Sequence, residues 1–162
     1  MSIIEGKGGK WFDELEVGQV FRHALRRTLT ETDNIMFTTM THNPAQLHLD
    51  ADYCARETEF GKPLINSLFT LGLVIGISVG DTTLGTAVAN LGMDKVKFPK
   101  PLFTGDTIRV ETEIIALRES KSRPTQGIVT FEHRAFNQHG ELVCTCQRSG
   151  LQHKKPAKLT PM

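Results

Sequence analysis

The segment THNPAQLHLD, residues 41–50, places two amides, a proline, two histidines and a carboxylate within ten positions. Histidine exchanges protons near neutral pH, so His48 is the natural candidate for a proton shuttle. The amides of Asn43 and Gln46 cannot take a proton, but they can orient a water molecule by hydrogen bonds. The segment therefore suits acid–base chemistry on a bound water.

A purely structural interpretation of the same segment stands beside this one. Asn43 directly precedes Pro44, and the residue before a proline avoids the α region, so the pair is expected to end a helix. Asp50 is expected to cap the helix that follows. In this interpretation His48 hydrogen-bonds its own loop, and His42 faces outward.

The flanking sequence predicts the elements that would hold these residues. Apolar residues at helical spacing and capping residues predict helices over 30–41, about 51–58 and about 66–79. Alternating apolar and polar residues predict strands over 20–30, 86–93, 95–102, 107–120, 127–138 and 141–152. Residues 1–18 are expected to form a loop with a short turn at EVGQ. FTGDT (103–107) and NQHGE (137–141) have the composition of turns.

The longest apolar run, residues 64–80, is shorter than the roughly 20 apolar residues of a membrane span, and polar residues interrupt it. We therefore expect a helix buried on all sides in the core. Gly72 and Gly76 lie four residues apart and so share one face. Because glycine costs about 1 kcal/mol in a helix, their presence indicates a close approach by a sheet or a partner helix.

One long apolar helix followed by antiparallel strands predicts an α+β fold, in which a curved sheet wraps around a central helix. The 162 residues suggest one domain over 1–162, with a basic C-terminal tail at 153–162 that we expect to be solvated. Such a sheet leaves open edges, which pairing of two copies in a dimer would close.

Composition narrows the function. With 19 basic and 18 acidic side chains, no overall charge favours nucleic acid. The three cysteines show neither a disulfide framework nor metal-ligand spacing, so we expect no metal. We expect a reducing, cytoplasmic setting. The N-terminus lacks an apolar stretch typical of a signal peptide. The loop cations Arg118, Lys121 and Arg123 are expected to be solvated, the alternative being contact with coenzyme A phosphates.

Two motifs carry a resemblance to a known family: the segment from Asn43 through EFGKPL (59–64), and FPKPLFTGDT (98–107). With their order around the apolar helix, they resemble the MaoC-like acyl dehydratases, the (R)-specific enoyl-CoA hydratases, over about residues 12–152. The resemblance implies a hot-dog fold, a dimer with substrate tunnels near its interface, and reversible addition of water to an enoyl-CoA thioester. It implies no cofactor besides the thioester substrate.

The family motif has an aspartate, an Asn-Pro pair and a histidine five positions after the aspartate. His48 matches the histidine, but the aspartate position holds Asn43. In this the chain is similar to the subgroup of mesaconyl-CoA hydratases, or β-methylmalyl-CoA dehydratases. A second departure is Asn66-Ser67 where the family commonly opens its central helix with His-Gly.

Hydration of an enoyl thioester needs a base that takes a proton from water and an acid that gives a proton to C2. It also needs a hydrogen-bond donor that stabilises the negative charge developing on the thioester oxygen. The resemblance gives the proton transfers to His48, with Asn43 or Gln46 orienting the water. Free backbone N–H groups at a helix start suit the oxyanion, which points to Asn66 and Ser67. The alternatives are a hot-dog thioesterase and a non-catalytic acyl-CoA-binding subunit, for which the missing aspartate is the best support.

Overall fold

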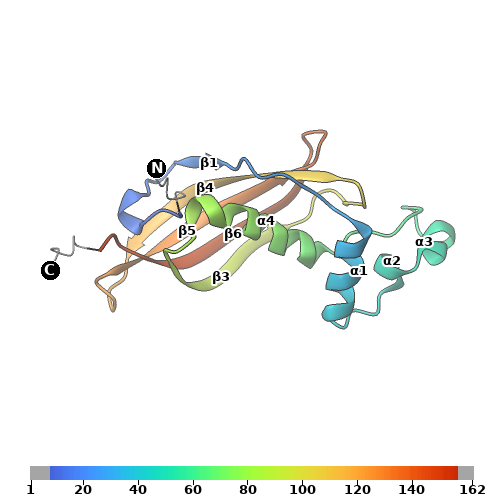
Figure 1. The fold of residues 1–162 in the computed structure, drawn as a ribbon, viewed down its shortest axis with the longest axis horizontal. Coiled ribbons are helices and arrows are strands. Elements are labelled where there is room, and N and C mark those ends of the chain that lie inside the picture. Colours follow the sequence, from blue (N-terminus) through green and yellow to red (C-terminus); the bar gives the residue numbers. More distant parts are fainter. Residues whose placement is uncertain (1–7, 157–162) are drawn as a thin grey trace, which may run out of the picture.

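The computed structural model describes residues 8–156, and an antiparallel sheet dominates them. The strands run in the order β1-β4-β5-β6-β3, and β2 pairs with the start of β4. Their bounds are β1 Val20–Arg22, β2 Arg27–Thr28, β3 Ala87–Lys97, β4 Thr107–Glu119, β5 Gln126–Phe136 and β6 Leu142–His153. The sheet curves around one long helix, α4, as predicted (Figure 1).

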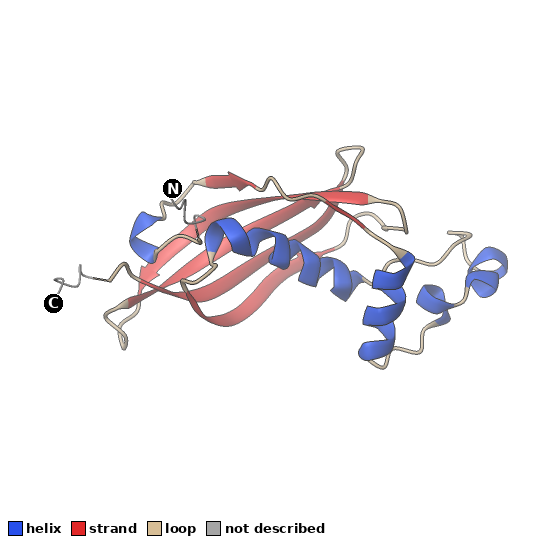
Figure 2. Cartoon of the chain, viewed as in Figure 1, coloured by secondary structure: helices blue, strands red, loops and turns tan. Residues whose placement is uncertain are grey.

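The helices occupy two places relative to the sheet. The helix α4 (Ser67–Thr82) crosses the concave face, whereas α1 (Glu31–Met40), α2 (Gln46–Leu49) and α3 (Ala51–Glu57) gather beyond one end of it (Figure 2). A 3-10 turn, η1 (Phe12–Glu14), lies at the other end, within the predicted N-terminal loop. The α1–α3 group meets the start of α4 and, through the ion pair of Arg27 with Asp33, strand β2.

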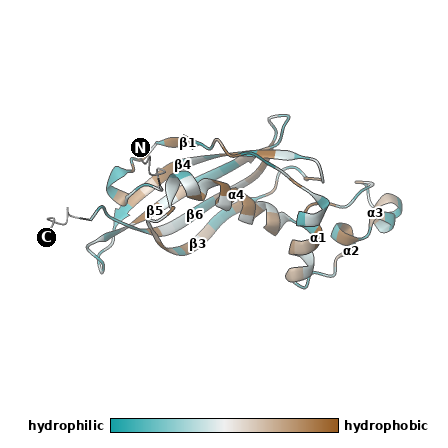
Figure 3. Cartoon of the chain, in the orientation of Figure 1, coloured by the Kyte–Doolittle hydropathy of each residue, from teal (hydrophilic) through white to brown (hydrophobic). Residues whose placement is uncertain are grey.

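The core lies between α4 and the concave face of the sheet. Side chains in β4, β5 and β6 alternate between buried and half-buried, so every second residue faces the helix. Val74 and Ile77 of α4 pack with Ile108, Val110 and other apolar residues. Figure 3 shows apolar residues along α4 above this face.

Two strand predictions were wrong. The stretch 20–30 is not one strand, because the chain leaves the sheet after β1 and returns as β2; between them His23 is buried and hydrogen-bonds Asp81 and Thr112. The predicted strands 86–93 and 95–102 merge into one strand, β3, which continues through irregularities in its pairing with β6 and ends at Lys97, so residues 98–102 lie outside it. The helices at 30–41 and 51–58 are confirmed, within a residue, as α1 and α3.

The prediction that the apolar helix is buried on all sides was also wrong. Leu68 is 61% exposed, and Gly72, Gly76 and Gly80, which continue the same face, are exposed too. A Cβ added at Gly72 or Gly76 would meet no described atom within 4 Å. The sheet therefore does not explain these glycines, and one face of α4 is uncovered in the single chain.

The turns predicted at FTGDT (103–107) and NQHGE (137–141) are confirmed. Asp106 Oδ2 accepts from the Phe103 N–H over 2.8 Å, and Gly105 adopts a left-handed φ of 95°. Asn137 Oδ1 accepts from the N–H groups of His139 and Glu141, which closes the β5–β6 hairpin.

The remaining predictions concern the cysteines, the loop cations and the chain ends. The three cysteines are free and buried. Arg118, Lys121 and Arg123 are exposed at the β4–β5 loop, far from α2 (Figure 1). The C-terminal segment, predicted as a solvated tail from 153, starts inside β6, and residues 157–162 lie outside the described part. No described helix is long and apolar enough to span a membrane.

Candidate active site

His48 lies in the short helix α2 and is half-buried. Its ring Nδ1 is 2.9 Å from the carbonyl oxygen of Leu64, which can only accept, so Nδ1 carries the proton of the neutral ring. No described residue bonds to Nε2, which is left as the acceptor of the neutral ring. The Leu64 carbonyl thus fixes both the orientation and the tautomer of the imidazole.

A cavity of about 400 Å³ lies beside this imidazole, within the range of small-molecule sites. Its walls come from α2, from the start of α4, from the segment that follows β3, and from β6. The lining residues are Leu47, His48, Phe60, Leu64, Ile65, Ser67, Thr70, Phe98, Lys100, Pro101, Leu102 and Val143. An apolar wall with few polar groups suits an acyl chain that carries one reactive carbonyl.

The start of α4 brings backbone donors to the same cavity. Asn66 is the N-cap, and its Oδ1 accepts from the Leu68 N–H over 3.0 Å. The Asn66 N–H itself donates to Asn34 Oδ1 over 2.8 Å and is therefore occupied. The Ser67 N–H has no acceptor among the described residues, and Ser67 lines the cavity. Of the two predicted oxyanion donors, Ser67 has the free N–H group.

The residue that joins these parts is Asn34 of α1, which the sequence did not single out. Its Nδ2 donates to the carbonyl oxygens of His48 over 3.0 Å and Leu64 over 2.9 Å, and its Oδ1 accepts from Asn66. The side chain is 3% exposed, so these bonds lie away from water. No local sequence signal marks Asn34, because its three partners lie 14, 30 and 32 residues away.

Asn43 lies in the turn between α1 and α2. Its Oδ1 accepts from the Ala45 N–H over 3.0 Å, an Asx turn that shapes the entry to α2. Asn43 does not line the cavity beside His48. Its water-orienting role stays a prediction, while its structural role is visible.

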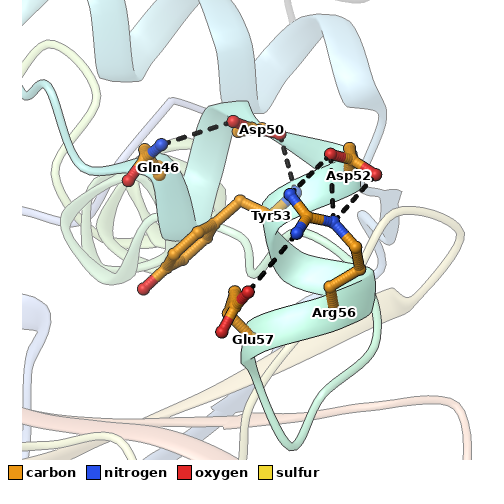
Figure 4. Close-up of polar contacts among 6 residues, drawn as sticks. All are labelled: Gln46, Asp50, Asp52, Tyr53, Arg56 and Glu57. Carbon is orange, nitrogen blue, oxygen red and sulfur yellow. Dashed lines mark hydrogen bonds and ion pairs between the residues drawn. The ribbon is translucent and has the colours of Figure 1, made fainter.

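Gln46 lies beside Asp50 at the junction of α2 and α3 (Figure 4). Asp50 Oδ1 accepts from the Tyr53 N–H over 2.8 Å, which confirms the predicted N-cap. Gln46 is exposed, its Nε2 lies 3.4 Å from Asp50 Oδ2, and its side chain is not part of the cavity wall. The role of Gln46 in orienting water stays a prediction. His42 is exposed, as expected.

Two lysines flank the site. Lys100 lines the cavity and pairs with Glu141 over 3.5 Å. The side-chain hydrogen bond from Asn137, and then the charge of Lys100, lower the pKa of Glu141. Lys62 lies 4.4 Å from the centre of the Phe103 ring and lines a smaller cavity of about 220 Å³, whose wall also includes His48. The imidazole thus borders two cavities, each with a cation.

No group of three or more His, Cys, Asp or Glu side chains that could hold a metal occurs among residues 8–156. The site offers instead a neutral imidazole, a free helix-start N–H and an apolar cavity. These are the parts for acid–base chemistry on a substrate with a polarised carbonyl.

Comparison with known proteins agrees with this arrangement. Residues 13–135 match the family described as the MaoC like domain. The chain belongs to this family. The (R)-specific enoyl-CoA hydratase of Aeromonas caviae is 34% identical over 81% of the chain and 90% of its own length. The family resemblance inferred from the two motifs is thereby confirmed.

The mesaconyl-CoA hydratase of Cereibacter sphaeroides is 32% identical over 94% of this MaoC-like chain. The match covers 43% of that protein, so the chain spans less than half the length of this curated relative. A Mycobacterium tuberculosis protein, described as having a double hotdog fold, superposes with a TM-score of 0.83 at 28% identity, over 96% of this chain and 47% of its own. The predicted hot-dog fold is confirmed.

Proposed function

We propose that this MaoC-like chain is a hydro-lyase that adds water reversibly to an enoyl-CoA thioester. The observation that carries the proposal is the pairing of His48 with the start of α4. The imidazole is held by Leu64 with Nε2 open, and it shares a cavity with the free N–H of Ser67. A proton acceptor and an oxyanion donor thus face one space large enough for an acyl group.

In the proposed hydration, His48 Nε2 accepts a proton from water as the water oxygen bonds to C3 of the enoyl group. Negative charge moves onto the thioester oxygen, where the Ser67 N–H and the positive end of α4 stabilise it. The charge then returns to C2, which takes a proton from the imidazolium. One water is consumed, and the imidazole ends neutral. Dehydration follows the same steps in reverse.

The substrate class rests on the relatives. Mesaconyl-CoA hydratase and β-methylmalyl-CoA dehydratase are among them, and their names point to a short, branched dicarboxylyl thioester. Lys100 and Lys62, beside the two cavities that His48 borders, suit the phosphates of coenzyme A. Coenzyme A thioesters and three free cysteines fit a reducing compartment, and we assign the reaction to the cytoplasm.

We further propose that two copies form a homodimer. The edge strand β3 is exposed along most of its length, with Leu91, Met93 and Val96 accessible. The face of α4 that carries Leu68, Gly72 and Gly76 is open as well. An exposed apolar edge beside an exposed helix face of small residues suits association with a second copy.

The test follows the absorbance of the conjugated enoyl thioester when the protein is given crotonyl-CoA or mesaconyl-CoA. We expect wild type to remove the signal, faster with mesaconyl-CoA. His48→Ala should lose at least about 100-fold in kcat, and His42→Ala, at an exposed histidine outside the cavity, serves as the matched control. Release of free CoA thiol would favour a thioesterase. Tight binding without turnover would favour a non-catalytic subunit.

A further inference from the structure

A chain of hydrogen bonds crosses the sheet beneath the C-terminal half of α4, away from the His48 site. Arg148 Nε lies 3.2 Å from His133 Nε2, and His133 Nδ1 lies 2.9 Å from Thr112 Oγ1. Thr112 Oγ1 in turn lies 2.8 Å from His23 Nε2, and His23 Nδ1 lies 2.7 Å from Asp81 Oδ2. Four of these five residues are buried, and Asp81 at the end is exposed.

The direction of each bond follows from the arginine. Arginine can only donate, so His133 Nε2 accepts, and His133 Nδ1 must carry the proton it donates to Thr112. The threonine hydroxyl then donates to His23, whose other nitrogen donates to Asp81. Every link is satisfied with neutral imidazoles. The chain therefore holds Arg148 in one position without placing a negative charge beside it.

Arg148 also borders a cavity of about 340 Å³ between the end of α4, the start of β3, and β6. Arg148 is 6% exposed, and its Nη2 is buried with no hydrogen-bond partner in the described part of the chain. Among residues 8–156 no acidic side chain lines the cavity, whose wall is largely apolar and includes Val79, Leu84 and Val88. The centre of the Phe131 ring lies 4.8 Å from Arg148 Cζ, so the guanidinium is packed against a ring face and not against a carboxylate.

A buried guanidinium without a carboxylate is unfavourable, because the charge has lost water and gained no counter-charge. An anion that enters the cavity beside Arg148 would supply that charge. A phosphate would need several donors, whereas this wall offers one free guanidinium edge and mostly hydrocarbon. A carboxylate on an apolar body satisfies both the cation and the wall.

We propose that this cavity is a second ligand site, in which Arg148 binds the carboxylate of a small organic acid with an apolar body. The site lies at the opposite end of α4 from Ser67, so it is distinct from the proposed hydratase cavity in the same chain. Asn90 of β3 and Gln152 of β6 also line it; the Asn90 amide can donate to a carboxylate, whereas Gln152 Oε1 can only accept.

The test measures binding of hexanoate and its uncharged counterpart hexanamide to the full chain by isothermal titration calorimetry. We expect hexanoate to bind at least about tenfold tighter than hexanamide, since a hydrogen bond to a charged group contributes that much. Arg148→Met should weaken hexanoate binding by the same factor or more. His48→Ala, in the other cavity, should leave it unchanged.

Gly150→Val gives a second test that does not depend on the arginine. A Cβ at Gly150 would lie 3.6 Å from the Ala89 carbonyl oxygen, an ordinary contact, and the added methyl groups would fill part of the cavity. Hexanoate binding should fall while Arg148 and its hydrogen bonds remain. This variant decides the question if Arg148→Met does not fold.

Three results would overturn the proposal. The first is no hexanoate binding by wild type, and the second is equal binding of hexanoate and hexanamide. The third is a dimer that Arg148→Met converts to monomers with no ligand effect, which would mean that a second copy supplies the missing carboxylate.

Discussion

The side-chain amide of Asn34 donates to the main-chain carbonyl of His48 over 3.0 Å and so ties the first helix to the proposed proton shuttle. The same amide group donates to Leu64, whose carbonyl oxygen also accepts from the His48 ring. One buried side chain on α1 therefore binds both the His48 main chain and the Leu64 carbonyl that orients the His48 ring. Asn34 is a positioning residue, since it does not line the larger cavity itself.

Replacing Asn34 by alanine should lower kcat more than it raises KM. We expect a loss of roughly 10- to 100-fold in kcat, because a small displacement of a catalytic group has that effect. The free energy of unfolding should fall by about 2–3 kcal/mol, as buried polar groups lose partners. Steady-state kinetics and urea unfolding measure the two effects.

Two variants control this experiment. Asn34→Asp keeps the acceptor for the Asn66 N–H but removes both donors, so it should not restore kcat. Thr32→Ala, at an exposed position on the same helix, should behave as wild type. A loss of stability in Asn34→Ala with kcat unchanged would refute the positioning role.

Asn43→Ala separates the two roles considered for Asn43. Because its Oδ1 accepts from the Ala45 N–H, we expect a stability loss of about 1 kcal/mol and less than a tenfold change in kcat. Asn43→Asp keeps the acceptor and should keep the stability. If Asn43→Ala instead lost kcat 100-fold at unchanged stability, the water-orienting role would be established.

Local sequence patterns predicted much of this fold. The capping box of Thr30 and Asp33 marks the start of α1, and the Asn-Gly composition of the β5–β6 turn marks the hairpin. Alternation identified β4, β5 and β6. Each of these signals lies within a few neighbouring residues, where spacing and backbone preference decide the structure.

The errors and omissions share a different cause, which is distance along the chain. His23 lies within the predicted strand 20–30, and its side-chain partner Asp81 is 58 residues away. Asn34 bonds to Leu64 and Asn66, 30 and 32 residues away. His48 was predicted from its residue type and its resemblance to a motif, whereas Asn34 becomes visible only once the elements are placed in space.

Acid should destabilise the protein through His133. Burial, and then the charges of Arg148 and His23, lower the pKa of His133 to about 3 from 6.5. Below pH 6.5 the unfolded chain binds a proton that the folded chain does not, so stability is full above pH 6.5 and is lost as pH falls toward 3. Between pH 7 and pH 5, His133 alone should lower the free energy of unfolding by about 2 kcal/mol.

Guanidinium unfolding at pH 7 and pH 5 measures this effect. His133→Asn should be less stable than wild type at pH 7. Its free energy of unfolding should, however, fall by about 2 kcal/mol less than that of wild type between pH 7 and pH 5. Ser149→Ala removes a half-buried hydroxyl on β6 that does not titrate, and it should keep the wild-type loss. An unchanged pH dependence in His133→Asn would show that His133 is not the group responsible.

The open face of α4 leads to a prediction about assembly. Gly76 is exposed, and a Cβ there would meet no described atom within 4 Å, so Gly76→Arg should not disturb the single chain. In the proposed homodimer a second copy covers this face, and the arginine would introduce a charge and a long side chain there. Sedimentation should show dimers for wild type and monomers for Gly76→Arg.

A folded monomer is the decisive outcome, because it separates failed association from failed folding. The circular dichroism of Gly76→Arg should match wild type, and Ser122→Arg, in the exposed β4–β5 loop, should stay dimeric. In a monomer, replacing glycine by a better helix former stabilises the helix by up to about 1 kcal/mol. A Gly76→Arg protein that stays dimeric would mean that the second copy binds elsewhere, leaving the exposed edge of β3 as the remaining candidate.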